Sequence, residues 1–196
     1  MSAVPNPLLT YHEYLSRERG ASAKSEFYRG QIFAMTGGSV RHNTISGNVF
    51  ASLRGYLRGT PCRPFNSDQR IRIPANGLAT YPDVSVVCGE FEVDSEDADA
   101  IINPVVIFEV LSKTSESYDR GKKFDFYRQL DSLREYVLIS QEEAQVERFV
   151  RQDDGSWNLT LFKGLQSELK IQSLCTLPLA VIFEDVVLGP EDGLPA

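Results

Sequence analysis

The spacing of apolar residues near the amino terminus predicts a short helix followed by a hairpin. A capping box over residues 10–13 predicts the helix start, because its threonine and glutamate side chains each satisfy an unpaired backbone amide. This helix should end near Glu18. Two short runs that contain aromatic and β-branched residues follow within 25–35, and the Arg29-Gly30 pair between them is typical of a tight hairpin turn.

A longer amphipathic helix should come next. Apolar residues recur at every fourth position, which places them on one face of a helix that runs from about Arg41 to near Gly59. The residues of this stripe are Ile45, Val49, Leu53 and Leu57. His42 falls on the same stripe, close to the start of the helix. We expect this histidine either to pack or cap there or to contact a substrate.

Two nearly continuous apolar runs predict buried strands, and a carboxylate accompanies each of them. Asp83 follows a proline and opens the run over 84–88, whereas Glu109 lies inside the run over 105–111. A carboxylate that is buried without a partner is costly. Both side chains therefore need a partner, and adjacent strands would bring them together.

The helix predicted over 118–130 supplies a partner. Its apolar face is formed by Phe124, Phe126, Tyr127 and Leu130. At about 100° per residue, Lys123 lies near the centre of this face, whereas Lys122 is turned towards solvent. Asp119 also lies on the inward half of the helix, where it would pair with Lys123 or with an arginine.

Two carboxylates beside an inward lysine are suited to phosphodiester cleavage. Carboxylate oxygens suit Mg²⁺ or Mn²⁺, and Mg²⁺ usually keeps several waters and leaves room for a substrate phosphate. The metal activates water, and an ammonium group orients that water and stabilises developing charge. We therefore expect Asp83 and Glu109 to bind the metal and Lys123 to act as the catalytic cation.

The rest of the chain predicts further strands, a second hairpin and a last short helix. Strands are expected over 63–66, 69–73, 133–139, 145–151 and 156–162, with the hairpin turn at 153–155 and the helix over 177–183. The length of 196 residues suits one core, so we expect a single domain over 1–196. Its tail should be loose from about residue 189.

At these residues the chain resembles the PD-(D/E)XK nuclease superfamily. Pro82-Asp83 matches the first motif, and Glu109-Val110-Leu111 matches the second except that a leucine stands where the lysine is usual. Together with the segment Tyr118 to Lys123, these residues more closely resemble the Uma family of bacterial "putative restriction endonucleases". In that family the lysine has moved to the helix and aligns with Lys123.

This resemblance implies an α/β (α+β) fold with a restriction-endonuclease-like core. Such a core has a central mixed β-sheet flanked by helices, here with amino-terminal and carboxyl-terminal β-hairpins. The implied activity is a metal-dependent endonuclease that hydrolyses phosphodiester bonds in double-stranded DNA. The Val110 carbonyl would complete the metal coordination, and Glu26 would be a further ligand. The alternative for Glu26 is an exposed strand glutamate.

The charge balance speaks against nucleic-acid binding. The net charge is −7 and the isoelectric point is near 4.9, whereas affinity for phosphate comes mainly from Lys and Arg. Part of the excess is local, because six acidic residues crowd 90–99, which we expect to be a surface loop. A basic face is still available from Arg41, Arg54, Arg58, Arg63, Arg70 and Arg72.

The cysteines and the apolar runs bear on the compartment. Cys62, Cys88 and Cys175 have no metal-ligand spacing, which argues against a zinc site or a disulfide framework and favours a reducing cytoplasm. No apolar run approaches the roughly 18 residues of a membrane helix. Nucleases that cut both strands often pair two sites, so a homodimer is expected.

Two hypotheses remain open for the activity. One is the active nuclease, which the intact Asp83 and Glu109 favour. The other is a catalytically inactive binding or accessory protein with the same fold, which the missing strand lysine and the acidic isoelectric point favour. A structural alternative also exists for Glu109 and Lys123, namely a buried salt bridge without chemistry.

Overall fold

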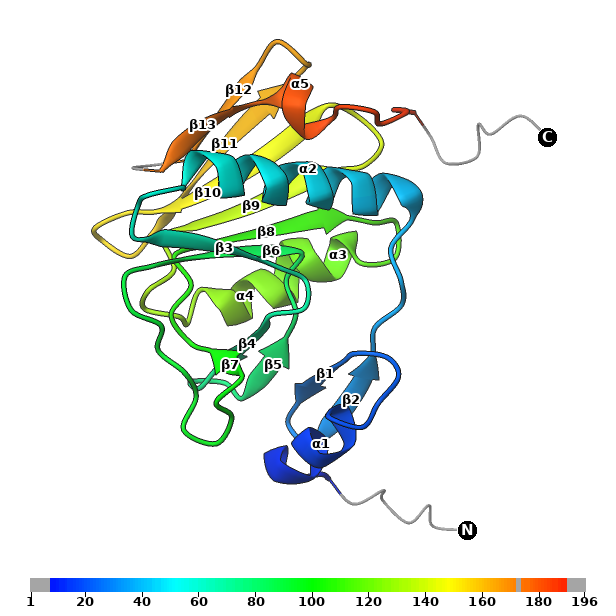
Figure 1. The fold of residues 1–196 in the computed structure, drawn as a ribbon, viewed down its shortest axis with the longest axis vertical. Coiled ribbons are helices and arrows are strands. Elements are labelled where there is room, and N and C mark those ends of the chain that lie inside the picture. The colour runs from blue at the N-terminus through cyan, green and yellow to red at the C-terminus, as the bar shows by residue number, and fades with distance from the viewer. Residues whose placement is uncertain (1–7, 172–173, 190–196) are drawn as a thin grey trace, which may run out of the picture.

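The computed structural model describes residues 8–171 and 174–189 (Figure 1). Its strands are β1 (Ser25–Tyr28), β2 (Gln31–Ala34), β3 (Cys62–Asn66), β4 (Arg70–Ile73), β5 (Leu78–Thr80), β6 (Val84–Cys88), β7 (Ala100–Ile101), β8 (Val106–Leu111), β9 (Glu135–Ser140), β10 (Gln145–Arg151), β11 (Trp157–Lys163), β12 (Glu168–Ile171) and β13 (Cys175–Pro178). Its helices are α1 (Tyr11–Glu18), α2 (Val40–Tyr56), α3 (Glu116–Tyr118), the π-helical turn η1 (Asp119–Lys123), α4 (Phe124–Tyr127) and α5 (Leu179–Ile182).

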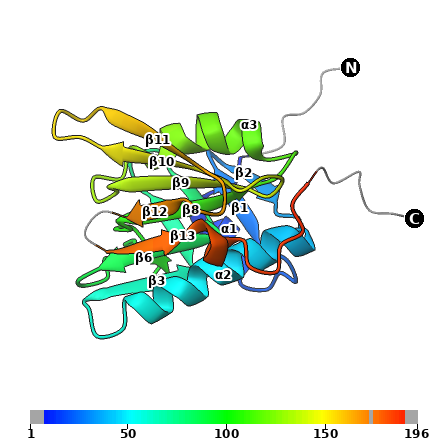
Figure 2. The same cartoon turned by 90° about the horizontal axis from the view of Figure 1, so that it is seen from above.

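A six-stranded sheet lies at the centre of the fold, in the order β11-β10-β9-β8-β6-β3. Only β8 and β9 are parallel in it, and the other neighbours are antiparallel. The helix α2 crosses one face of this sheet, whereas α3 and α4 lie on the other (Figures 1 and 2). The predicted mixed sheet flanked by helices is therefore confirmed.

Apolar side chains fill both interfaces of this sheet. On one face, the predicted stripe of α2 is buried against β6, β8 and β9. On the other face, Phe124 stacks on Tyr136 with ring centroids 5.0 Å apart, and Tyr127 is fully buried beside them. Because both faces are covered, the central strands have almost no exposed position, as their continuous apolar runs predicted.

Strand register brings the functional residues to one edge of the central sheet. The antiparallel pair β6 and β8 sets Val84 opposite Phe108, so Asp83, one residue earlier, lies beside Glu109. The parallel pair β8 and β9 sets Leu111 beside Ser140, so the residues after these two strands also become neighbours.

The amino-terminal region forms as predicted, but it joins a second sheet that was not foreseen. The capping box is present, and β1 and β2 pair across a turn in which Arg29 and Gly30 have φ values of 47° and 83°. A side chain at Gly30 would also clash, because a Cβ there would lie 2.6 Å from Leu8. The five-stranded sheet has the order β2-β1-β5-β4-β7 and carries Glu26.

The interpretation of Arg70 and Arg72 as part of a basic surface was wrong. Both side chains are buried: the Arg70 Nε lies 2.8 Å from Asp97 Oδ2, and the Arg72 Nε lies 3.9 Å from Asp94 Oδ2. The acidic segment folds back over β4 rather than forming only a surface loop. Alternation along a strand shows which residues share a face, but it does not show what covers that face.

The structure also contradicts the prediction that the cysteines form no disulfide. Cys62 and Cys88 are bonded to each other, whereas Cys175 is a free thiol. The two bonded residues are directly paired across β3 and β6. Because 26 residues separate them in sequence, their pairing depends on strand register, which no local spacing reveals.

The carboxyl-terminal region differs in part from the prediction. The hairpin of β10 and β11 is present, but the expected helix over 177–183 is shorter, and its first residues belong to β13, which pairs with β12. The predicted tail lies outside the described residues beyond Gly189. Within the described part of the chain, no helix is both long and apolar enough to cross a bilayer.

The pair of Arg70 and Asp97 gives a test of this packing. Asp97 is 1% exposed, and it also accepts a hydrogen bond from the Tyr11 hydroxyl of α1. Replacing Asp97 with alanine should lower the free energy of unfolding by about 3 kcal/mol or more, because Arg70 would be buried without its carboxylate. Urea denaturation measures this change.

Asp68→Ala is the matched control, because Asp68 pairs with Lys24 on the surface. It should cost less than about 1 kcal/mol. Equal losses in the two variants would contradict the buried pairing.

Candidate active site

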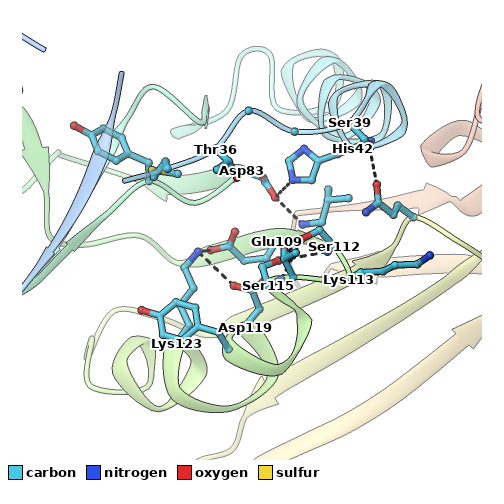
Figure 3. A pocket seen from close by; sticks show the side chains of 18 of the residues that line it. Thr36, Ser39, His42, Asp83, Glu109, Ser112, Lys113, Ser115, Asp119 and Lys123 are labelled. Carbon is cyan, nitrogen blue, oxygen red and sulfur yellow. Dashed lines mark hydrogen bonds and ion pairs between the residues drawn. The ribbon is translucent and has the colours of Figure 1, made fainter. Parts of the chain in front are cut away.

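A cavity of about 400 Å³ opens where the start of α2 and the end of β8 face the helical segment 116–127 (Figure 3). All candidate residues from the sequence line it: Glu26, His42, Asp83, Glu109, Val110, Asp119 and Lys123. They come from two sheets and two helices. The structure therefore brings together the whole predicted set, while the role of each residue stays a prediction.

Lys123 lies at the centre of a group of carboxylates. Its Nζ is 2.8 Å from Glu109 Oε1, 3.5 Å from Asp119 Oδ1 and 3.6 Å from Glu26 Oε1. The lysine is only 6% exposed. Burial opposes its charge, but Glu109, Asp119 and Glu26 outweigh burial and raise the pKa of the lysine well above its usual range. Lys123 is therefore an ammonium group at neutral pH.

Glu109 is 4% exposed and is held from two sides. Its Oε1 accepts hydrogen bonds from Lys123 and from the Tyr127 hydroxyl, which is 2.9 Å away. Burial raises the pKa of Glu109, and Lys123 offsets this shift only in part, because Asp119 and Asp83 raise the pKa further. Surplus negative charge of this kind favours the binding of an additional cation.

The helix that carries Lys123 differs from the regular helix expected over 118–130. Helical structure begins at Glu116 and ends at Tyr127, and its centre, residues 119–123, is a π turn. The Tyr136 hydroxyl donates a hydrogen bond of 3.0 Å to the Asp119 carbonyl. This bond comes from a strand that no helix periodicity can foresee. Such π turns often occur at functional sites.

The predicted orientation of the two adjacent lysines is nevertheless confirmed. Lys123 points into the cavity (Figure 3), whereas Lys122 is exposed. The Lys122 ammonium lies over the rings of Tyr28 and Phe126, 5.3 and 5.6 Å from their centroids. The π turn shifts the hydrogen bonding of the helix but leaves the inward face with the same residues.

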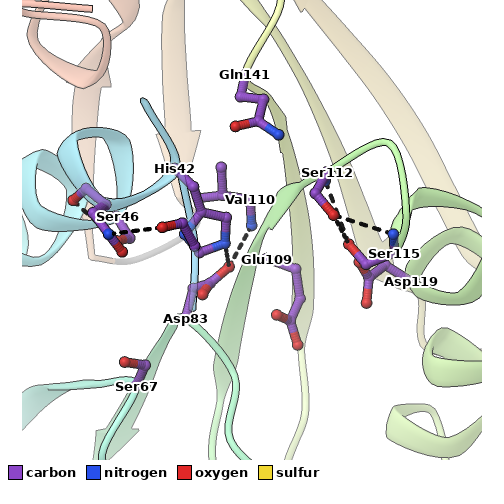
Figure 4. A network of polar contacts seen from close by, with 12 residues as sticks. His42, Ser46, Ser67, Asp83, Glu109, Val110, Ser112, Ser115, Asp119 and Gln141 are labelled. Carbon is purple, nitrogen blue, oxygen red and sulfur yellow. Dashed lines mark hydrogen bonds and ion pairs between the residues drawn. The ribbon is translucent and has the colours of Figure 1, made fainter. Parts of the chain in front are cut away.

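Asp83 is fixed through one of its oxygens. The Oδ2 accepts hydrogen bonds from the Val110 amide, at 2.7 Å, and from His42 Nε2, at 3.1 Å (Figure 4). Burial lowers the pKa of His42, but the hydrogen bond and the charge of Asp83 outweigh this effect, so the net shift is upward. The histidine therefore contacts a carboxylate of the site.

The start of α2 sets the position of His42. Ser39 caps the helix and accepts a hydrogen bond of 3.1 Å from the His42 amide. Gly38 leaves room for the imidazole, because a Cβ at that position would lie 2.5 Å from His42 Nδ1. The glycine loop thus serves the geometry of the site.

The oxygens of the site suit a hard divalent cation. Asp83 Oδ1 and Glu109 Oε2 have no hydrogen-bond donor among the described residues, because the donors occupy the other oxygen of each carboxylate. Two carboxylates with room for water and phosphate are typical of Mg²⁺ sites. Within the described ranges, no three His, Cys, Asp or Glu side chains already converge as a metal cage.

Three contacts of the site escaped the sequence interpretation. Tyr127 was assigned to packing, although its place four residues after Lys123 already put both on one face. The Thr80 hydroxyl donates to the carboxylate of Glu26. Gln141 lines the cavity as well and accepts a hydrogen bond from Ser39. Neither Thr80 nor Gln141 carries a local signal, because each depends on strand pairing.

Comparison with known proteins identifies the family. The Uma2 family, described as "Putative restriction endonuclease", matches residues 11–181. The chain belongs to the Uma2 family. The resemblance seen around Asp83, Glu109 and Lys123 is thereby confirmed, and the family supports nuclease activity in general terms.

Two relatives and one solved structure extend this comparison. The uncharacterized proteins slr1290 and sll1609 of Synechocystis sp. are each 35% identical to this Uma2 protein; the first alignment covers 88% of this chain and 89% of slr1290, and the second 87% and 96%. The crystal structure of a "putative nuclease belonging to DUF820" from Anabaena variabilis matches with a TM-score of 0.72. It is 17% identical, covers 89% of this chain and 97% of that chain, and shows a shared fold.

The buried lysine gives a test of the electrostatics of the site. Lys123→Met removes the cation between three carboxylates, so in EDTA we expect the free energy of unfolding to fall by about 3 kcal/mol or more. The methionine keeps most of the apolar stem, so the loss reports mainly on charge. Urea denaturation at neutral pH measures it.

Lys122→Met is the adjacent control and should change stability by less than about 0.5 kcal/mol, because its ammonium is exposed. A larger loss from Lys122→Met than from Lys123→Met would refute the charge arrangement described above.

Proposed function

We propose that this Uma2 protein is a metal-dependent endonuclease that hydrolyses phosphodiester bonds in DNA. The observation that carries this proposal is the buried ammonium of Lys123, 2.8 Å from Glu109, in a cavity that Asp83 also lines. A salt bridge that served stability alone would not need further carboxylates around the same ammonium or a cavity beside it. The Uma2 assignment supports the same class of activity.

Asp83 and Glu109 would hold Mg²⁺ or Mn²⁺, with the Val110 carbonyl as a further ligand. When bound, the metal supplies Lewis-acid polarisation of the phosphate and lowers the pKa of a coordinated water. The residues around it position the ligands: His42 and the Val110 amide hold one oxygen of Asp83, and Tyr127 holds one oxygen of Glu109. The remaining oxygens face the cavity.

Lys123 acts as a hydrogen-bond donor rather than as a base, because its raised pKa keeps it protonated. From its place beside Glu109 it orients the attacking water and stabilises the negative charge that develops on the phosphate oxygens. Asp119 and Glu26 contact the same ammonium and hold it in place. Glu26 is also close enough to the site to serve as a further metal ligand.

Double-stranded DNA is the substrate that we propose, cut by a homodimer in which each protomer serves one strand. Phosphate contacts would come from exposed arginines, because Arg70 and Arg72 are occupied by Asp97 and Asp94. Arg54, Arg58 and Arg63 are exposed and have no acidic partner among the described residues. Action on chromosomal or invading DNA would place the protein in the cytoplasm.

Metal binding is the first test of this function. Mn²⁺ or Mg²⁺ should raise the melting temperature of the wild type, because a ligand that binds only the folded state stabilises it, by about 2.7 kcal/mol at one hundred times its Kd. Asp83→Asn and Glu109→Gln should abolish both this shift and any cleavage. Isothermal calorimetry gives the affinity directly.

Asp68→Asn serves as the control, because Asp68 is a surface carboxylate paired with Lys24, and it should keep the metal response. Absence of Mg²⁺ and Mn²⁺ binding by the wild type would exclude the metal-dependent mechanism. Metal binding without cleavage of DNA or RNA would instead favour the inactive accessory protein.

The lysine separates catalysis from metal binding. Lys123→Met should lower the rate of metal-dependent cleavage by roughly 10²- to 10³-fold, the usual cost of losing one group that stabilises transition-state charge. Metal affinity should be kept or increased, because a competing cation is removed. Single-turnover cleavage of a labelled duplex measures the rate.

Lys122→Met, made on the outward face of the same helix, should cleave at close to the wild-type rate. If both substitutions reduced cleavage equally, the assignment of Lys123 as the catalytic cation would be incorrect.

A further inference from the structure

Gln141 is a polar side chain that the proposed mechanism does not use, although it is only 3% exposed. It is the first residue after β9, and its Oε1 accepts a hydrogen bond of 2.7 Å from the Ser39 hydroxyl at the start of α2. Figure 4 shows Gln141 at the end of its strand, between the His42 and Ser112 sides of the network. The side chain thus bridges the two elements that border the cavity.

The hydrogen bonds around Ser39 determine which way the amide of Gln141 points. The Ser39 oxygen accepts from the His42 amide at 3.1 Å, and its single hydrogen is donated to Gln141. The atom that receives this hydrogen must be the amide oxygen. The amide nitrogen therefore faces the cavity, and its two N–H groups have no acceptor among the described residues.

A second cavity, of about 500 Å³, lies next to the first. Ser112, Lys113 and Gln141 line both cavities, so these three residues mark the place where the two meet. Ser112 and Gln141 follow the ends of the neighbouring parallel strands β8 and β9. Ligands of α/β sheets bind just beyond such strand ends, and Lys113 places a cation at the same place.

The chemistry of these groups restricts the ligand. The amide oxygen is already occupied by Ser39, so Gln141 is unable to form the bidentate donor and acceptor pair that recognises adenine. What remains are two N–H donors, the Ser112 hydroxyl and the Lys113 ammonium. This set fits a group that only accepts hydrogen bonds and carries negative charge, which on a nucleic acid is the phosphodiester.

We propose that Gln141, Ser112 and Lys113 form a second phosphate subsite, which binds the phosphodiester group adjacent to the one that is cleaved. This inference rests on the proposed nuclease function. The subsite contributes to substrate affinity and to the register of the strand in the site, rather than to the chemical step. Gln141 is a binding residue in this arrangement, and Ser39 is a positioning residue that orients its amide.

Gln141→Glu is the most informative variant. A carboxylate still accepts the hydrogen bond of Ser39, but both N–H donors are lost and a negative charge faces the phosphate. With the full chain, Mn²⁺ and a labelled duplex, we expect KM to rise about tenfold or more and kcat to stay within about threefold. Gln166→Glu, an exposed glutamine changed in the same way, is the control and should match the wild type.

A modified substrate tests the same contact without depending on the variant. Methylphosphonate replaces a charged phosphate oxygen with a methyl group, and it is placed at one flanking position at a time. At one of these positions wild-type KM should rise about tenfold, and Gln141→Glu should show little further loss there, because the two changes remove one interaction.

Several results would overturn the subsite. They are an unchanged KM for Gln141→Glu, a loss in kcat alone, a loss that occurs with only one base sequence, fully additive effects of variant and substrate, or a wild type that is indifferent to methylphosphonate at both flanks. Failure of the wild type to cleave or bind nucleic acid at all would instead remove the proposed nuclease function, so the two failures are distinguishable.

Discussion

The contact between the Lys123 ammonium and the Glu109 carboxylate is the interaction on which the rest of the site depends. Neither charge is stable at this depth without the other, and removing one partner of a buried pair is far more costly than the pair itself is worth. The carboxylates around Lys123 come from β1, from β8 and from the helix itself. One ammonium group therefore ties the second sheet to the central sheet, and the cavity lies where these elements meet.

The surrounding structure keeps this pair in a geometry that is useful for chemistry. Each carboxylate of the proposed metal site has one oxygen held by donors of the protein, and the other oxygen faces the cavity. The Tyr136 hydroxyl supports the π turn from the neighbouring strand. Orientation is thus fixed by groups outside the reacting set, which means that little rearrangement is needed when a metal and a phosphate enter.

Features with a local cause could be predicted from the sequence, and features with a distant cause could not. The capping box, the Arg29-Gly30 turn and the inward face of Lys123 each depend on residues a few positions apart. The second sheet, the buried arginine pairs, the bond between Cys62 and Cys88, and the place of Gln141 depend on strand pairing across 26 residues or more. The π turn also belongs to this group, because its carbonyl is satisfied by a tyrosine from β9.

The same distinction resolves the conflict between acidic composition and a nucleic-acid substrate. Net charge counts every carboxylate equally, yet Asp97 neutralises a buried arginine, and Glu26, Glu109 and Asp119 surround a buried lysine. These groups are spent within the protein and do not face a ligand at the surface. At the cavity the remaining negative charge would repel phosphate until a divalent cation enters. An acidic site of this kind therefore couples nucleic-acid binding to metal binding, because the cation converts a repulsive site into an attractive one.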